Sequence, residues 1–360
     1  MELLPHPVAM GTVMAEMNVK TFSHTVVGLA LIVVMGLVGV KATAQTAEGE
    51  GILGLFVPVG TISDGSSAYA EQLRAYRLVN MLMRLGLPAF WIAEPFEYED
   101  DMLPRGSFWV PAPDGTPSVA ALAQELADRL GVPYTIVYAR RFASGEPRIS
   151  AFRLRPVSVA VYQGDRTYSG AADIASSLEL VGVYPRYVTD IEIRRGALDD
   201  YDILVMPGGA QDVQSYALGP AGKANIRSFV ESGGGYLGIC AGAYLASAPQ
   251  FELNLVDAPS QGRGVIGTWI AVRQRPGSHP LFRGYDDMIS DLYYGGGPNF
   301  VSDHRAIAVL EGVPQSWKPG LQGLAAVIED TCGSGCAALV ESSSRHCCSR
   351  MHIRPGVIAR

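Results

Sequence analysis

The sequence predicts an α/β fold made of two consecutive α/β units, and two observations support this prediction. Short apolar runs typical of buried strands alternate along the chain with amphipathic patterns typical of helices. The 41 glycines of the chain suit the close turns that join strands to helices in such folds. With 360 residues, of which 48% are hydrophobic, the chain can bury an adequate core without disulfides.

The first 44 residues read as an export signal. An apolar run from Thr25 to Val40 is shorter than the roughly 20 residues that a membrane-spanning helix needs. Lys20 precedes this run, and Ala42-Thr43-Ala44 follows it with the small-residue pattern of a cleavage site. We expect a secretory signal peptide over residues 1–44 and a periplasmic or extracellular mature protein. An uncleaved membrane anchor is the alternative.

Residues 45–148 are predicted to form a smaller, N-terminal α/β domain. Ala143-Ser144-Gly145-Glu146-Pro147 has the composition of a linker, which places the boundary near residue 148. The alternation of strands and helices before this linker suggests a parallel sheet of its own. The predicted elements are a strand over Gly51–Val59, a helix over Ala68–Leu85, a strand over Pro88–Ala93, a helix over Ser118–Leu130 and a strand over Pro133–Tyr138.

The larger domain is predicted over residues 149–331, beginning with a strand over Val157–Tyr162. A second apolar strand lies within Tyr201–Ala210 and runs into Pro207-Gly208-Gly209. A glycine turn at the carboxyl end of a parallel strand can present backbone N–H groups to a ligand. This turn is therefore a candidate oxyanion hole.

Cys240 is the most informative residue of the chain. Gly238 and Gly242 flank it two residues away on either side, as small residues flank the nucleophile at a sharp strand-to-helix turn. We expect the positive end of the following helix to lower the pKa of the thiol from its ordinary value of about 8.5. The backbone N–H of Ala241 is then the second candidate oxyanion donor, with that of Gly209. The alternative is a buried cysteine that acts as a small apolar residue.

Four segments follow one another in the larger domain: Ile203–Ala210, a predicted helix over Ala221–Ser232 that ends in Gly233-Gly234-Gly235, Tyr236–Ser247 and Tyr293–Phe300. Taken together, they resemble the class I glutamine amidotransferase-like superfamily, and among its members most closely the N-terminal domain of fungal-type biotin-protein ligases. The resemblance extends from about Pro156 to Ile328, roughly half of the chain.

This resemblance implies a flavodoxin-like parallel sheet with helices on both faces. It also implies, in active members, a Cys-His-Glu triad that hydrolyses an amide, with Cys240 as nucleophile and the N–H groups of Gly209 and Ala241 as oxyanion donors. Asp165 follows the first strand of the domain and should approach Cys240 if the strand order is the family's; a simple loop aspartate is the alternative. The expected substrate contacts are Gly208, Tyr244, Tyr294, Gly296 and Asp165.

The general base is not fixed by a motif. Active amidotransferases carry His-Pro-Glu after a final strand, which corresponds here to residues 333–340, with the histidine expected near Ser343. His346 comes three residues later, and His304, beside Asp303, is a second candidate. A thiolate without a base attacks more weakly, so a degenerate site that only binds a ligand is the alternative.

Residues 332–360 read as an irregular, Cys-rich tail. Four of the five cysteines of the chain lie there. Cys332 and Cys336, followed by His346-Cys347-Cys348, suggest zinc, but the spacing differs from that of usual zinc sites, so we expect no metal. A change of reading frame after Gly335 would explain both the missing His-Pro-Glu and the sudden cysteine enrichment.

The function predicted from these features is an exported, cysteine-dependent amide hydrolase that acts on a small-molecule amide or a peptide. A noncatalytic protein that binds a small ligand, or a scaffold of the cell envelope, is the alternative. The net charge of −7 argues against nucleic acid or an anionic membrane surface as partner, so the membrane is reached only through an uncleaved N-terminal segment. No phosphate-binding loop motif occurs, and we expect no cofactor.

Overall fold

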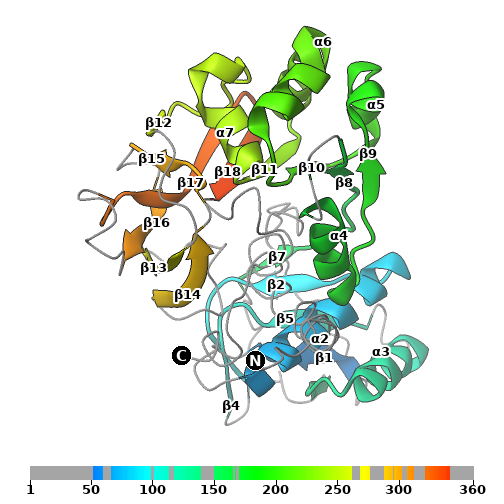
Figure 1. Ribbon diagram of the computed structural model, residues 1–360. Coiled ribbons are helices and arrows are strands. Elements are labelled where there is room, and N and C mark those ends of the chain that lie inside the picture. The colour runs from blue at the N-terminus through cyan, green and yellow to red at the C-terminus, as the bar shows by residue number, and fades with distance from the viewer. Residues whose placement is uncertain are drawn as a thin grey trace, which may run out of the picture.

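The computed structural model contains two separate β-sheets with helices packed on them (Figure 1). Within the described residues, no helix is both long enough and apolar enough to cross a bilayer. The predicted signal peptide and the predicted linker lie outside these residues. The structure describes residues 52–59, 66–98, 101–112, 117–138, 150–164, 167, 170–261, 268–275, 288–294, 296–301, 306–311 and 321–340.

The smaller sheet has the strand order β6-β1-β5-β2-β7, and its neighbouring strands are all antiparallel. Helices α2 (Ser66–Arg84) and α3 (Pro117–Leu130) pack beside it, and β3 (Phe96–Tyr98) pairs with β4 (Asp101–Leu103) in a separate hairpin. The strands are β1 (Ile52–Val57), β2 (Phe90–Ile92), β5 (Phe108–Pro111), β6 (Thr135–Tyr138) and β7 (Ala151–Arg153).

The prediction of a parallel sheet in this unit was wrong. The sequence pattern located β1, α2, β2, α3 and β6 but missed β5 and β7. Because β5 lies between β1 and β2, those two strands do not pair with each other. Each pairs instead with a strand that runs in the opposite direction.

The larger sheet has the path β14-β13-β16-β17-β18-β11-β10-β8-β9, with β12 and β15 beside it. The five strands from β18 to β9 are parallel to one another. The others are antiparallel. The strands are β8 (Val159–Tyr162), β9 (Arg186–Val188), β10 (Ile203–Met206), β11 (Gly235–Ile239), β12 (Ser260–Gln261), β13 (Thr268–Gln274), β14 (Met288–Tyr294), β15 (Asn299–Phe300), β16 (Ala306–Glu311), β17 (Ala325–Cys332) and β18 (Gly335–Val340).

The mixed α/β class is therefore confirmed, but the sheets are mostly antiparallel and a flavodoxin-like parallel sheet is not shown. The parallel strands are interrupted where β17 turns back through a tight hairpin into β18. Residues 335–340, expected at the start of an irregular tail, instead form a buried strand beside β11. The helices of this unit are α4 (Gly170–Leu180), α5 (Asp190–Arg194), α6 (Gln211–Glu231) and α7 (Ala241–Ser247), with 3-10 turns at Ala197–Asp200 and Pro249–Phe251.

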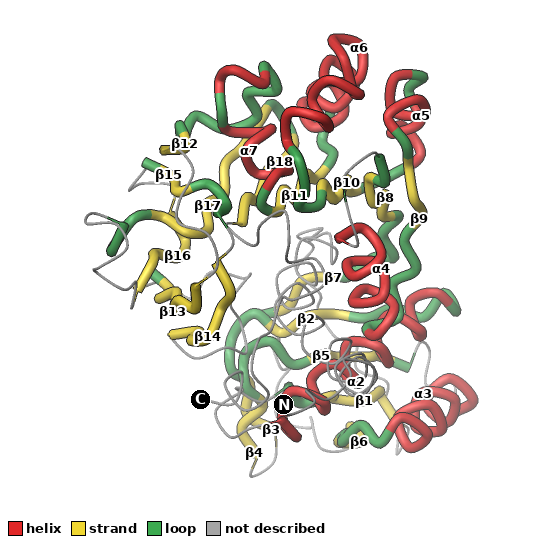
Figure 2. The backbone as a smooth tube through the Cα atoms, in the orientation of Figure 1, coloured by secondary structure: helices red, strands yellow, loops and turns green. Residues whose placement is uncertain are grey.

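The two sheets share one apolar core. Leu78 of α2 and Phe108 of β5 belong to the same buried cluster as Val205 of β10 and Cys240. Figures 1 and 2 show α4 reaching from the larger sheet toward α2. At this junction the side-chain amide of Asn80 donates to the Val181 carbonyl at 2.8 Å. The predicted boundary near residue 148 lies outside the described residues and stays a prediction.

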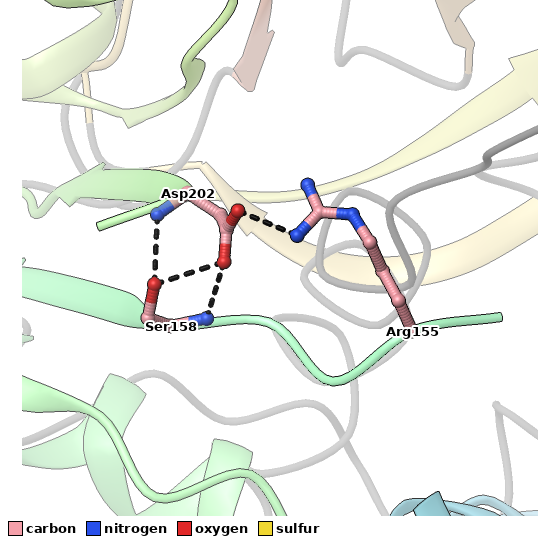
Figure 3. Close-up of polar contacts among 3 residues, drawn as sticks. All are labelled: Arg155, Ser158 and Asp202. Atoms are coloured by element: carbon pink, nitrogen blue, oxygen red, sulfur yellow. Dashed lines mark hydrogen bonds and ion pairs between the residues drawn. The ribbon is translucent and has the colours of Figure 1, made fainter. Parts of the chain in front are cut away.

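Asp202 ties together the amino ends of two parallel strands (Figure 3). Its carboxylate accepts hydrogen bonds from the Ser158 backbone N–H at 2.7 Å and the Ser158 hydroxyl at 2.8 Å, and it pairs with Arg155 at 2.6 Å. Ser158 precedes β8 and Asp202 precedes β10. Partial burial opposes ionisation of Asp202, but the hydrogen bonds from Ser158 and Arg155 outweigh it and hold its pKa below the ordinary 3.8.

Replacing Asp202 by Asn should lower the free energy of unfolding at pH 7 by about 1–3 kcal/mol, because charged hydrogen bonds are lost. The folded pKa is depressed, so the contribution is full above the unfolded pKa and disappears as the pH falls through the folded value. Urea unfolding of both proteins at pH 7 and near pH 3 measures this difference. Asp200→Asn, at an exposed neighbour, is the matched control and should change little. A difference that does not shrink in acid would contradict the assignment.

Candidate functional site

Cys240 occupies a sharp turn between β11 and α7. Its backbone has φ 53° and ψ −104°, a conformation that residues other than glycine rarely adopt. The side chain is buried, with 5% of its surface exposed. Such strain persists only where the surrounding structure enforces it, and it is concentrated at functional sites.

Two glycines allow this turn to press against the end of β10. A Cβ atom at Gly242 would collide with the carbonyl oxygen of Met206, and one at Gly238 would collide with the Gly242 backbone. Met206 is also the register partner of Gly238 in the parallel pair β10–β11. The contact places the Pro207-Gly208-Gly209 turn, which continues directly from Met206, next to the turn at Cys240.

Hydrogen bonding within α7 orients the N–H of Ala241. The Cys240 carbonyl accepts from the Tyr244 N–H at 3.0 Å, so it points along the helix. In a planar trans peptide the N–H points opposite to the carbonyl. The N–H of Ala241 therefore points out of the amino end of α7. Gly209 has φ 147°, which also restricts this position to glycine.

Tyr236 stabilises the turn at Cys240 through a buried hydrogen bond. Its hydroxyl donates to the Gly242 carbonyl at 2.7 Å, and the side chain is fully buried. Burial raises the pKa of this phenol far above its ordinary value of 10.0, so the group stays protonated and remains a donor. This bond fixes the first turn of α7 on the strand that leads into Cys240.

The carboxyl end of β18 meets Cys240. The Cys240 N–H donates to the carbonyl of Val340, the last residue of β18, at 3.0 Å. Strand β18 therefore ends beside the backbone of Cys240, and the resemblance expects a histidine a few residues later in the sequence. His346, His304 and Asp165 lie outside the described residues, which contain no histidine at all, so their roles stay predictions.

Tyr244 of α7 and Tyr294 of β14 both contact a second glycine segment, Gly296-Gly297. The Tyr244 hydroxyl lies 3.2 Å from the Gly297 carbonyl and 3.4 Å from that of Gly296, and the Tyr294 hydroxyl donates to Gly297 at 3.1 Å. Asn299 donates from its side-chain amide to the Tyr294 oxygen at 3.1 Å. Both tyrosines are buried, so these contacts position the segment. Direct contact of Tyr244, Tyr294, Gly296 or Gly208 with a substrate stays a prediction.

The geometry argues against a metal held by Cys332 and Cys336. Cys336 is the register partner of Thr331, so its side chain and that of Cys332 lie on opposite faces of the hairpin. The Cys336 thiol donates to Glu329 at 3.0 Å, and burial together with the Glu329 and Asp330 carboxylates raises its pKa. In the part of the chain that the structure describes, no cluster of three or more metal-ligating side chains occurs.

Sequence reasoning missed one polar residue at the site, Gln214. Gln214 lies in a first helical segment, residues 211–218, which the break at Gly219 separates from the rest of α6. Gly219-Pro220 reads as a helix boundary, and the backbone at Gly219 is indeed non-helical, with φ 58° and ψ −175°, so α6 consists of two helical segments. A polar residue five positions after the last glycine of the turn was the available signal.

One family model matches part of the chain. Residues 197–260 match the model of the biotin-protein ligase N-terminal domain, which supports a domain of that kind here. A stretch of 46 residues is 50% identical to an uncharacterized protein of Chlamydia muridarum. That match covers 13% of this chain and 18% of the relative, so the chain spans less than a fifth of its length.

Two solved structures show distant similarity to this chain. A ThuA-like protein of Bacteroides uniformis is 12% identical, with a TM-score of 0.38 over 52% of this chain and 82% of its own. A β-galactosidase of Bacillus circulans is 13% identical, with a TM-score of 0.36 over 65% of this chain and 33% of its own. Similarity of this degree assigns neither a substrate nor an activity.

Replacing Tyr236 by Phe should lower the free energy of unfolding by about 1–2 kcal/mol, because the Gly242 carbonyl loses a buried donor. Urea denaturation followed by circular dichroism measures this change. The matched control is Tyr216→Phe, since Tyr216 is 89% exposed, and it should change stability by less than about 0.5 kcal/mol. Equal effects of the two substitutions would contradict the role given to the Tyr236 hydroxyl.

Proposed function

We propose that this protein is an exported, cysteine-dependent amide hydrolase of the glutamine amidotransferase-like type, built on a flavodoxin-like arrangement of its five parallel strands. The observation that carries the proposal is the strained backbone of Cys240, held against the glycine turn that follows β10. A cysteine that only filled the core would not require a positive φ, which is unfavourable for every residue that has a side chain.

In the proposed reaction the Cys240 thiolate attacks the carbonyl carbon of the amide. The electron pair of the C=O bond moves onto oxygen, where the N–H groups of Gly209 and Ala241 stabilise it. Collapse of this intermediate breaks the C–N bond, a proton is transferred to the departing amine, and a thioester forms on Cys240. Water then cleaves the thioester to release a carboxylic acid and the thiol.

The base and acid of this reaction are assigned to a histidine that follows β18 or the second glycine segment. His346 is six residues after Val340, whose carbonyl accepts from Cys240. His304 is five residues after Asn299, in the segment that Tyr244 contacts. Either imidazole would accept the thiol proton and return it to the leaving amine.

A noncatalytic ligand-binding protein, or an envelope scaffold, is the second candidate function. It is favoured by one observation: no His-Pro-Glu follows the final strand in the sequence. A protein of this kind would keep the turn at Cys240 as part of its fold and bind a small amide or peptide without cleaving it. The two functions differ in the reactivity of the thiol.

The test is acetyl transfer from p-nitrophenyl acetate to the full-length protein. We expect one equivalent of p-nitrophenolate in a rapid phase, an acetyl group on the Cys240 peptide in mass spectra, and an apparent pKa for the rate below about 8.5. Cys240→Ser is the control for the remaining cysteines. His346→Ala and His304→Ala separate the candidate bases, because loss of the base slows the rapid phase. An inert Cys240 would favour the binding protein.

The predicted export of the protein is tested through cleavage of its signal peptide. Expression in a bacterial host that has a general secretion system should yield a protein whose N-terminus is Gln45, because cleavage is expected after Ala44. Sequencing the N-terminus of the recovered protein checks this. Ala42→Asp combined with Ala44→Asp should block cleavage. A membrane-bound product that retains residues 1–44 in the wild type would identify an anchor instead.

A further inference from the structure

Gln214 lies beneath the glycine turn that follows β10. It occupies the fourth position of α6, and its side chain is fully buried. Its backbone N–H donates to the Ala210 carbonyl at 3.0 Å, so the helix starts directly after the turn. Its side-chain nitrogen Nε2 lies 3.5 Å from both the Pro207 and the Gly208 carbonyl oxygens.

The orientation of this amide is set by its neighbours. If the amide were rotated by half a turn, Oε1 would face two carbonyl oxygens, and all three atoms are acceptors. With Nε2 facing them, Oε1 is left buried without a hydrogen-bond partner. A buried acceptor in this state is destabilising, and an apolar residue of the same length would avoid it. Packing alone therefore gives no reason for glutamine at this position.

The position of the Gln214 Nε2 atom determines the orientation of the peptide between Gly208 and Gly209. The Gly208 carbonyl and the Gly209 N–H belong to one planar trans peptide and point in opposite directions. A donor that holds the Gly208 carbonyl toward the interior therefore turns the Gly209 N–H toward the other side of the turn. The Tyr244 N–H acts in the same way on the Cys240 carbonyl and thereby directs the N–H of Ala241.

We propose that Gln214 is a positioning residue that orients the Gly209 N–H as an oxyanion donor. This inference rests on the proposed function, since an oxyanion donor has a role only if Cys240 undergoes acyl transfer. Gln214 does not itself touch the substrate. It acts through the Gly208–Gly209 peptide, which glycine leaves free to rotate unless a partner holds it.

Two reactions of the same thiol test the proposal. Acetyl transfer from p-nitrophenyl acetate passes through a tetrahedral oxyanion, whereas alkylation by iodoacetamide displaces iodide at a saturated carbon and forms none. Both rates are measured on the Cys240 peptide by mass spectrometry, for wild type and Gln214→Met. We expect the substitution to slow acetyl transfer about tenfold or more and to leave alkylation within about twofold.

Gln214→Leu is the second variant, because an aliphatic side chain of similar size offers no donor. It should show the same selective loss. Gln72→Met is the matched control: Gln72 is also a buried helical glutamine, but it lies in α2. This control should leave both rates unchanged.

The outcomes distinguish a failure of the proposed role of Gln214 from a failure of the proposed hydrolase function. If the wild type transfers the acetyl group and Gln214→Met does so equally fast, the positioning role is wrong and the hydrolase remains. If both reactions of the variant slow by the same factor, Gln214 is only structural, and the inference is again overturned. If the wild type itself shows no acetyl transfer to Cys240, the proposed function falls and this inference falls with it.

Discussion

The close approach of α7 to the end of β10 is the constraint on which the site depends. Because Gly242 has no side chain, the backbone of the helix can touch the Met206 carbonyl. One added methyl group would separate the two elements, and with them the turn at Cys240 from the turn at Gly208-Gly209. The strained φ of Cys240 is the local cost of this contact, which packing and the buried Tyr236 hydroxyl offset.

The two ends of the parallel strands differ in their contacts: stabilising hydrogen bonds lie at the amino ends and the candidate site lies at the carboxyl ends. At the amino ends, the Asp202 carboxylate joins the chain before β8 to the chain before β10 through charged hydrogen bonds. At the carboxyl end of β10, the chain continues into the Pro207-Gly208-Gly209 turn, which lies beside the turn at Cys240. Ligands of open α/β sheets bind at the carboxyl ends of the strands, and stabilising contacts at the opposite ends leave that edge free.

The hydrophobic pattern of a single segment was enough to predict several helices and strands of the structure. The strands β8, β10 and β11 and the turn at Cys240 follow from short apolar runs bounded by glycine. Pairing is not local, so the antiparallel order of the smaller sheet could not be read from the same signals. Gln214 lies in the short helical segment that ends at the break at Gly219, and the sequence of this segment gives no clear helical pattern. Candidate bases remain known from sequence alone.

The position of β18 in the sheet delays the pairing of β11 during synthesis of the chain. β11 ends at Ile239, yet its partner β18 begins only at Gly335, so nearly one hundred residues are synthesised before the two strands can pair. Until then one side of β11 is an unpaired edge that carries Cys240 at its tip. Such edges recruit other chains, so a ribosome paused in this interval, or a protein shortened before Val340, would expose a template for aggregation.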